Sequence, residues 1–101
     1  SNPHRKMIEV SDLFENVTSV CLEIGFGGGE HLVYQAERNP NIGFIGCEPY
    51  INGVAMLARK LSKLDLTNVR IYPGDVRDLF DVLPDASIDN VFLLSVNKLQ
   101  N

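Results

Sequence analysis

A glycine-rich stretch, LEIGFGGGEHL at residues 22–32, constrains the fold of this chain more than any other feature of its sequence. Four of the five positions 25–29 are glycine, and the preceding run VTSVCLEI (17–24) is apolar and rich in β-branched residues. The following run, 29–39, has helical character and stops before Pro40, because a residue ahead of proline is disfavoured in helical backbone. A buried strand, a glycine turn and a helix are therefore expected in succession.

Further apolar runs alternate with helical patterns along the chain. Strands are expected at 42–47, 69–72 and 88–94, and helices at about 52–64 and 75–83. The first of these two helices has an apolar stripe at helical spacing and cations expected to face water; the stripe is Val54, Leu57, Ala58, Leu61 and Leu64, and the cations are Arg59, Lys60 and Lys63. Since parallel neighbours need a crossover connection, we expect an α/β, Rossmann-like fold: a partial parallel sheet of about four strands flanked by helices.

The chain's size and charge limit the classes of function. Its 101 residues with a net charge of −4 suit one domain, expected at 17–94, between an N-terminal tail with a short amphipathic segment (1–16) and an atypical tail (95–101). We expect a cytoplasmic protein without membrane contact, since no apolar run approaches the roughly 20 residues of a membrane span. Without a basic cluster, the segment taken alone favours a small-molecule ligand over nucleic acid.

The two cysteines lie inside expected strands. Cys21 and Cys47 each lie in a largely apolar run, which is typical of core thiols in a reducing cytosol. Their context and spacing favour neither a disulfide nor a metal site.

Charge around the glycine turn discriminates between nucleotide ligands. A dinucleotide fingerprint beginning at Gly25 would place its third glycine at position 30, which is Glu30. The residues instead read acid-x-Gly-x-Gly-x-Gly, with Glu23 ahead of Gly25, Gly27 and Gly29. A pyrophosphate on the N–H groups of a helix start would be repelled by such carboxylates. S-adenosylmethionine carries a sulfonium and an ammonium and has no phosphate, so the pattern favours this cofactor over NAD.

Two more acids follow the next two expected strands. Glu48 ends the second strand, where a carboxylate can accept hydrogen bonds from ribose hydroxyls, and Asp75 follows the third, where it could accept from an adenine amino group. Either acid could instead be a solvated strand-end residue, or, for Asp75, a helix N-cap. Glu30 is interpreted as a helix-start charge, His31 as a surface residue of the helix, and the Asn52-Gly53 pair as local backbone geometry.

Four segments resemble one known family. LEIGFGGGEHL, GFIGCEP, LTNVRIYPGD and LPDASIDNVFLL are similar to the cofactor-binding half of bacterial tRNA guanine-N7 methyltransferases, a family of class I S-adenosylmethionine-dependent enzymes, over about residues 21–94. The resemblance implies transfer of a methyl group from S-adenosylmethionine to N7 of a guanosine in the variable region of tRNA. It places the family's cofactor-binding acids at Glu23, Glu48 and Asp75. With the glycines of the turn, the expected cofactor-binding residues are Glu23, Gly25, Gly27, Glu48 and Asp75.

The chain departs from the family after Leu94. The family continues with a Pro-Asp-Pro-Trp segment and a basic stretch, whereas this sequence reads SVNKLQN and contains no tryptophan. We therefore expect either a truncated form or residues joined across a missing segment, with tRNA contacts mostly outside this chain and with no catalytic residue identified within it. The alternatives are a non-catalytic cofactor-binding or interaction module, self-associating through the edge of the fourth strand, and an NAD-dependent enzyme.

Overall fold

A computed structural model of the chain describes residues 6–93. Its elements alternate after a short N-terminal turn: η1 (Val10–Asp12), β1 (Ser19–Ile24), α1 (Glu30–Arg38), β2 (Ile42–Cys47), α2 (Ile51–Ser62), β3 (Val69–Tyr72), α3 (Val76–Phe80) and β4 (Asn90–Leu93). The expected order of strands and helices is confirmed. The tail expected at 95–101 and the end of the fourth strand at 94 lie outside the described residues.

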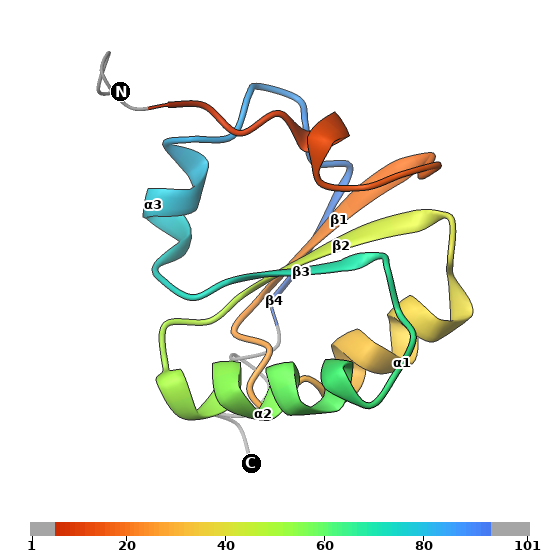
Figure 1. The fold of residues 1–101 in the computed structure, drawn as a ribbon. Helices are drawn as coiled ribbons and strands as arrows, with labels where there is room; N and C mark the ends of the chain where they lie inside the picture. Colours follow the sequence, from red (N-terminus) through yellow and green to blue (C-terminus); the bar gives the residue numbers. More distant parts are fainter. Residues whose placement is uncertain (1–5, 94–101) are drawn as a thin grey trace.

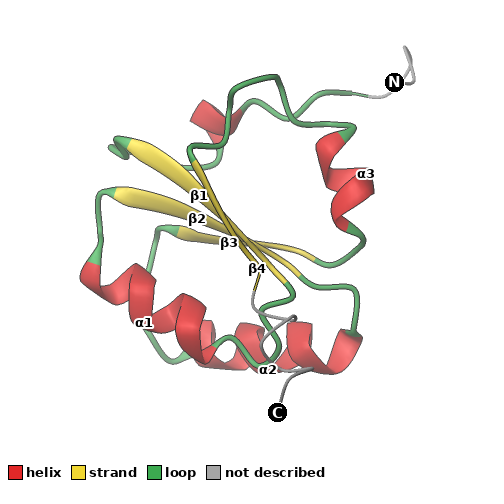
Figure 2. Ribbon diagram, turned by 180° about the vertical axis from the view of Figure 1, so that it is seen from behind, coloured by secondary structure: helices red, strands yellow, loops and turns green. Residues whose placement is uncertain are grey.

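The four strands form one parallel sheet in the order β3-β2-β1-β4. Helices α1 and α2 cover one face, while α3 and the N-terminal segment cover the other, as Figure 1 and, from behind, Figure 2 show. Two apolar clusters follow from this layering. Val20 and Leu22 of β1 belong to the cluster on the α3 side, and Cys21 belongs to the cluster with α1 and α2. The predicted α/β, Rossmann-like class is confirmed.

The two central strands are buried on both faces, as their continuous apolar sequences predict. β1 and β2 are paired over six residues, from Ser19 with Ile42 to Ile24 with Cys47. This pairing puts both carboxyl ends level, directly before the glycine turn and Glu48. The two neighbouring ends create the edge of the sheet at which ligands of open α/β folds bind.

Helix α2 differs in detail from the expected pattern. It ends at Ser62, so Leu64 lies beyond it, and Ala58 is exposed, while Leu57 is fully buried. Lys60, expected to face water, instead donates from Nζ to the Gly28 carbonyl at 3.0 Å. The physical reason is that α2 packs against the glycine turn. The long side chain of Lys60 therefore reaches a backbone carbonyl of that turn.

The N-terminal segment packs onto the sheet. Phe14 is buried in the cluster on the α3 side, and the backbone N–H of Ile8 donates to the Val82 carbonyl at 2.7 Å. Phe14 also lies where a Cβ on Gly43 would come within 2.7 Å of its ring. The glycine in β2 therefore makes room for this aromatic ring.

Candidate functional site

The glycine turn between β1 and α1 depends on three residues in left-handed backbone. Gly25, Gly27 and Gly29 have φ values of 72°, 63° and 90°. Residues other than glycine rarely adopt this backbone conformation. The glycines at every second position of the motif therefore coincide with the positions that have a positive φ. The turn is tied to the next strand by the N–H of Gly25, which donates to the Cys47 carbonyl at 2.8 Å. The structure thus gives each of these glycines a conformational reason.

Glu48 is a buried carboxylate that organises the turn. It is 4% exposed, and its Oε1 accepts from the N–H of Gly27 at 2.8 Å while Oε2 accepts from the N–H of Tyr50 at 3.3 Å. A carboxylate has about four acceptor positions, so each oxygen keeps one for another partner. Glu48 is therefore both a structural acceptor for the turn and a candidate ligand acceptor.

A cavity of about 300 Å³ lies at the carboxyl ends of the strands. Its lining includes Gly25, Glu48, Tyr50 and Asp75, together with Val76 at the start of α3. The structure brings together in one cavity three of the five predicted cofactor-binding residues, Gly25, Glu48 and Asp75. Gly27 is joined to them through Glu48. The volume is at the lower end of the range for small-molecule sites.

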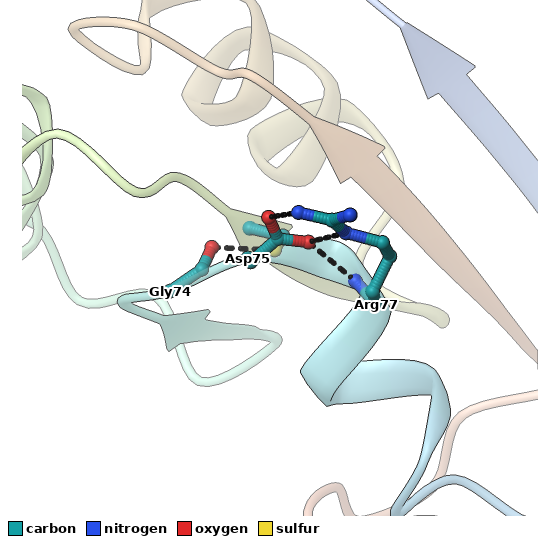
Figure 3. A network of polar contacts seen from close by, with 4 residues as sticks. Gly74, Asp75 and Arg77 are labelled. Carbon is teal, nitrogen blue, oxygen red and sulfur yellow. Dashed lines mark hydrogen bonds and ion pairs between the residues drawn. The ribbon is translucent and has the colours of Figure 1, made fainter.

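Asp75 caps the short helix α3. Its Oδ1 accepts from the backbone N–H of Arg77 at 2.8 Å, and its two oxygens accept from the Arg77 guanidinium at 3.0 and 2.8 Å. Figure 3 shows this fork, with the Arg77 side chain folded back over the carboxylate. The hydrogen bonds from Arg77 lower the pKa of Asp75 to about 2. The N-cap interpretation is confirmed, and any contact from Asp75 to an adenine amino group would be additional to this role.

Glu23 lies outside the lining of the cavity. Its side chain is 1% exposed, and its Oε1 is 2.7 Å from Nδ1 of His31 in the first turn of α1. His31, interpreted from sequence as a surface residue, is half-buried and held by this carboxylate. The sequence shows an acid near the end of the first expected strand and a histidine near the start of the helix that follows. Their spacing alone does not show that the two side chains are in contact.

Besides the contact between Glu23 and His31, the sequence did not reveal the close approach of Gly53 to the glycine turn. A Cβ built at this position in the first turn of α2 would stand 2.3 Å from the Gly27 carbonyl oxygen and 3.3 Å from Cγ of Glu48. Only glycine allows α2 to approach the turn this closely. The interpretation of Gly53 as mere local backbone geometry is therefore wrong: its role is a tertiary contact.

The cysteines are core residues. Cys21 and Cys47 are free and buried. Burial, together with the charge of Glu23, raises the pKa of Cys21 to about 11. Burial, with Asp75 and Glu48 as lesser causes, raises that of Cys47 to about 11. Thiols that resist ionisation in this way are poor nucleophiles. Among residues 6–93, no group of three potential metal ligands is gathered.

Comparison with known sequences identifies the family. A family described as "Putative methyltransferase" matches residues 17–95. The chain belongs to this methyltransferase family. The matched range contains the glycine turn, Glu48 and Asp75, so the site lies within the part of the chain that defines the family.

Several relatives are more specific in name and longer than this chain. A tRNA (guanine-N(7)-)-methyltransferase of Paracoccus denitrificans is 59% identical over 92 residues, covering 91% of this chain and 40% of the relative. Its counterpart in Ruegeria pomeroyi is 60% identical over 93 residues, covering 92% of this chain and 39% of the relative. The chain thus spans about 40% of the length of these relatives.

Solved structures of methyltransferases share the fold. A precorrin-6y C5,15-methyltransferase from Geobacter metallireducens has a TM-score of 0.67 at 24% identity, covering 83% of this chain and 44% of that one. A SAM-dependent methyltransferase from Aquifex aeolicus has a TM-score of 0.63 at 24% identity, covering 80% and 42%. The predicted methyltransferase type of Rossmann-like fold is confirmed. No helix within the described range 6–93 has the length and apolar character needed to cross a membrane.

Proposed function

We propose that this chain is the S-adenosylmethionine-binding portion of a tRNA (guanine-N7)-methyltransferase. The observation that carries the proposal is the 59% identity over 92 residues with a relative of that name, across a segment that contains the whole glycine turn and its carboxylates. Transfer RNA is the substrate that this relationship implies, with most of its contacts made outside these residues. We place the activity in the cytoplasm, where tRNA would be available to it.

The cavity fits the adenosine part of this cofactor. Glu48 has acceptor positions left on both carboxylate oxygens after it binds the turn, and ribose hydroxyls are donors that would use them. Gly25 brings backbone without a side chain to the same cavity. Asp75, at the far side of the lining, has the acceptor chemistry that an adenine amino group requires. We infer that Glu23, Gly25, Gly27, Glu48 and Asp75 hold the cofactor, with Glu23 and Gly27 acting at the turn itself.

The electrostatics of the turn favour a cationic ligand. Glu48 is buried next to the N–H of Gly27, so it occupies a donor that a pyrophosphate would need. Glu30, at the start of α1, is 74% exposed and is partly offset by Lys60 at 3.8 Å. Glu48 is therefore the carboxylate on which the preference against a dinucleotide mainly depends.

The chemistry asks little of the protein beyond positioning. When bound, S-adenosylmethionine supplies an electrophilic methyl group on a sulfonium. N7 of guanine has a lone pair and no proton, so the chain needs neither a general base nor a nucleophile of its own. Its residues contribute by fixing the turn and holding the two reacting partners in line.

Removal of the Glu48 carboxylate tests the cofactor site. Glu48→Ala should weaken S-adenosylmethionine binding about 10- to 100-fold in calorimetry, since a hydrogen bond to a charged group contributes roughly 1.5–3 kcal/mol. Glu37→Ala, an exposed carboxylate on α1, is the matched control and should bind like the unsubstituted protein. An unchanged dissociation constant for Glu48→Ala would remove this residue from the site, and tighter binding of NADH would reverse the cofactor assignment.

Methyl transfer tests the reaction itself. The full natural protein should transfer a labelled methyl group from S-adenosylmethionine to tRNA, and chemical cleavage at N7-methylguanosine should map the label to one position. Transfer to another atom or another nucleotide would contradict the proposed reaction.

A second candidate function follows from the sheet edge. Within the described residues β4 is an edge strand, and all four of its residues are exposed, including Val91 and Leu93 at 49% and 54%. Exposed apolar edge strands are templates for pairing with another chain. A non-catalytic module that self-associates through β4 would run as a dimer in size-exclusion chromatography with light scattering, whereas a strict monomer argues against it.

A further inference from the structure

Glu23, His31 and Phe92 form a cluster outside the lining of the cofactor cavity. The ring of His31 lies 6.0 Å from the ring of Phe92, edge to face at 73°, and its Nδ1 is held by Glu23 at 2.7 Å. The two rings are partly open, since the His31 side chain is 38% exposed and Phe92 is 44% exposed, while Glu23 is 1% exposed. We call the two rings the His31–Phe92 pair.

The pair lies at the topological switch point of the sheet. β1 has β2 on one side and β4 on the other, because the chain crosses back over the sheet between β3 and β4. Glu23 is opposite Phe92 in the pairing of these two strands, so both side chains leave the sheet on the face covered by α1. Ligands of open α/β folds bind in the crevice at such a reversal.

The pair and the adenosine cavity lie on different sides of β1. The cavity with Glu48 and Asp75 is built by the ends of β1, β2 and β3, whereas the pair is built by β4 and the first turn of α1. The glycine turn connects the two places, since it begins at the end of β1 and leads directly into the turn that carries His31. If the adenosine of the cofactor occupies the cavity, the region next to the His31–Phe92 pair, on the β4 side of β1, is available to the second substrate, the base that is methylated.

The chemistry of the pair matches a purine base. Oε1 of Glu23 lies 2.7 Å from Nδ1 of His31 and orients the ring; in the tautomer with its hydrogen on Nδ1, that nitrogen donates to Glu23 and Nε2 is an acceptor. The second ring nitrogen, Nε2, can then bond to the Watson–Crick edge of a base, and Phe92 offers an aromatic surface of the kind on which splayed-out bases stack. Guanine has hydrogen-bonding groups on this edge that are remote from N7, so such contacts leave the reacting lone pair free.

We infer that the His31–Phe92 pair contacts the methyl-accepting guanine, with Nε2 of His31 at its Watson–Crick edge and Phe92 against its ring face. This inference rests on the proposed function. Glu23 then acts through His31, as a positioning residue that keeps the imidazole in one orientation. The pair determines which base is accepted, whereas the cofactor is held by the residues named under the proposed function.

Two amide substitutions of His31 separate the roles of its two nitrogens. In the full natural protein with tRNA, His31→Asn places an amide near the position of Nδ1 and keeps a partner for Glu23, while His31→Gln reaches the position of Nε2. We expect kcat/KM for tRNA to fall at least about 10-fold in His31→Asn and clearly less in His31→Gln. Phe92→Leu, which keeps bulk and loses the aromatic face, should also fall at least about 10-fold.

The affinity for S-adenosylmethionine is the readout that a merely structural role would move. It should stay within about twofold in His31→Asn, which keeps a partner for Glu23, and in Phe92→Leu, which leaves Glu23 and His31 unchanged. Val91→Ala is the matched control, because Val91 lies in the same strand with a similar exposure of 49% and its side chain leaves the other face. Its kcat/KM should be unchanged.

Each result decides the inference. Unchanged kcat/KM in His31→Asn and Phe92→Leu would overturn it, and so would a loss that weaker cofactor binding fully explains or a loss equal in His31→Asn and His31→Gln. A natural protein that binds the cofactor but does not methylate tRNA would refute the proposed function first, and this inference with it. An active natural protein with fully active variants would refute the inference alone.

Discussion

Adding one methyl group at Gly53 of α2 should displace the glycine turn and so weaken cofactor binding. The Cβ of Gly53→Ala would lie 2.3 Å from the carbonyl oxygen of Gly27, where ordinary contacts are 3.4–4 Å. The two backbones must therefore separate by roughly 1 Å. The contact joins the added Cβ, which is fixed to the helix backbone, to a backbone oxygen of the glycine turn, so no side-chain rotation can relieve it.

Two opposing terms set the size of the effect on stability. Alanine in a helix is favoured over glycine by about 1 kcal/mol, whereas overpacking typically costs about 1–3 kcal/mol. Gly53→Ala should therefore range from neutral to about 2 kcal/mol less stable. The effect on binding should be larger, because a displaced Gly27 loses its 2.8 Å hydrogen bond to Glu48. Glu48 would then be out of place for the ligand, and the loss of one ligand hydrogen bond to this carboxylate, roughly 1.5–3 kcal/mol, corresponds to about 10- to 100-fold weaker binding of S-adenosylmethionine.

Calorimetry and thermal unfolding of Gly53→Ala and Gly28→Ala test this reasoning. Gly28 is the matched control, because its Cβ would meet only the flexible ends of Glu30 and Met56, each at 3.0 Å, and its φ is not left-handed. Gly28→Ala should keep its affinity within about threefold. The reasoning is refuted if Gly53→Ala is more stable and binds normally, or if both variants lose affinity equally.

Three further predictions follow from the structure. Asp75 has a lowered pKa of about 2, so its interaction with Arg77 is fully present above the ordinary pKa of 3.8 and is lost as the pH falls toward 2. In Arg77→Ala, NMR titration should find the pKa of Asp75 raised because the guanidinium is gone, but still below 3.8 because the backbone N–H of residue 77 continues to donate. At pH 8, a disulfide reagent should modify Cys21 and Cys47 slowly in the folded protein and rapidly in urea, because burial and a pKa of about 11 suppress the thiolate, and fast native labelling would contradict this. If β4 pairs two copies, Val91→Lys should return a dimer to monomer in light scattering, and a dimer that persists would exclude this edge.

The order of elements was predictable because the signals are local. Strands β2 and β3 match the expected ranges 42–47 and 69–72, and α1 begins directly after the last glycine of the turn. Boundaries moved where the signal was weak: β1 begins at Ser19 instead of residue 17, and α3 ends at Phe80 instead of residue 83. The alternating glycines of the turn were readable for the same reason, since left-handed backbone is a property of single residues.

The contacts that complete the site were not predictable from spacing. Gly53 against Gly27, and Lys60 on the Gly28 carbonyl, join α2 to the glycine turn across many residues of intervening chain. His31 meets Glu23 because helix α1 packs back onto the strand that precedes it. Each contact depends on how a helix is placed over the sheet, which sequence periodicity does not determine.

The sequence by itself determined the alternation of strands and helices, the glycine turn and the presence of acids at the strand ends, because these depend on backbone preference and on the side chain at each position. The tertiary structure alone decided which acids share a cavity. It separated Glu23, bound to His31 on the α1 face, from Glu48 and Asp75 around the cavity. The reason is that the partners of each acid are set by how the helices pack on the sheet: Glu23 meets the first turn of α1, whereas Glu48 lies between the glycine turn and the start of α2.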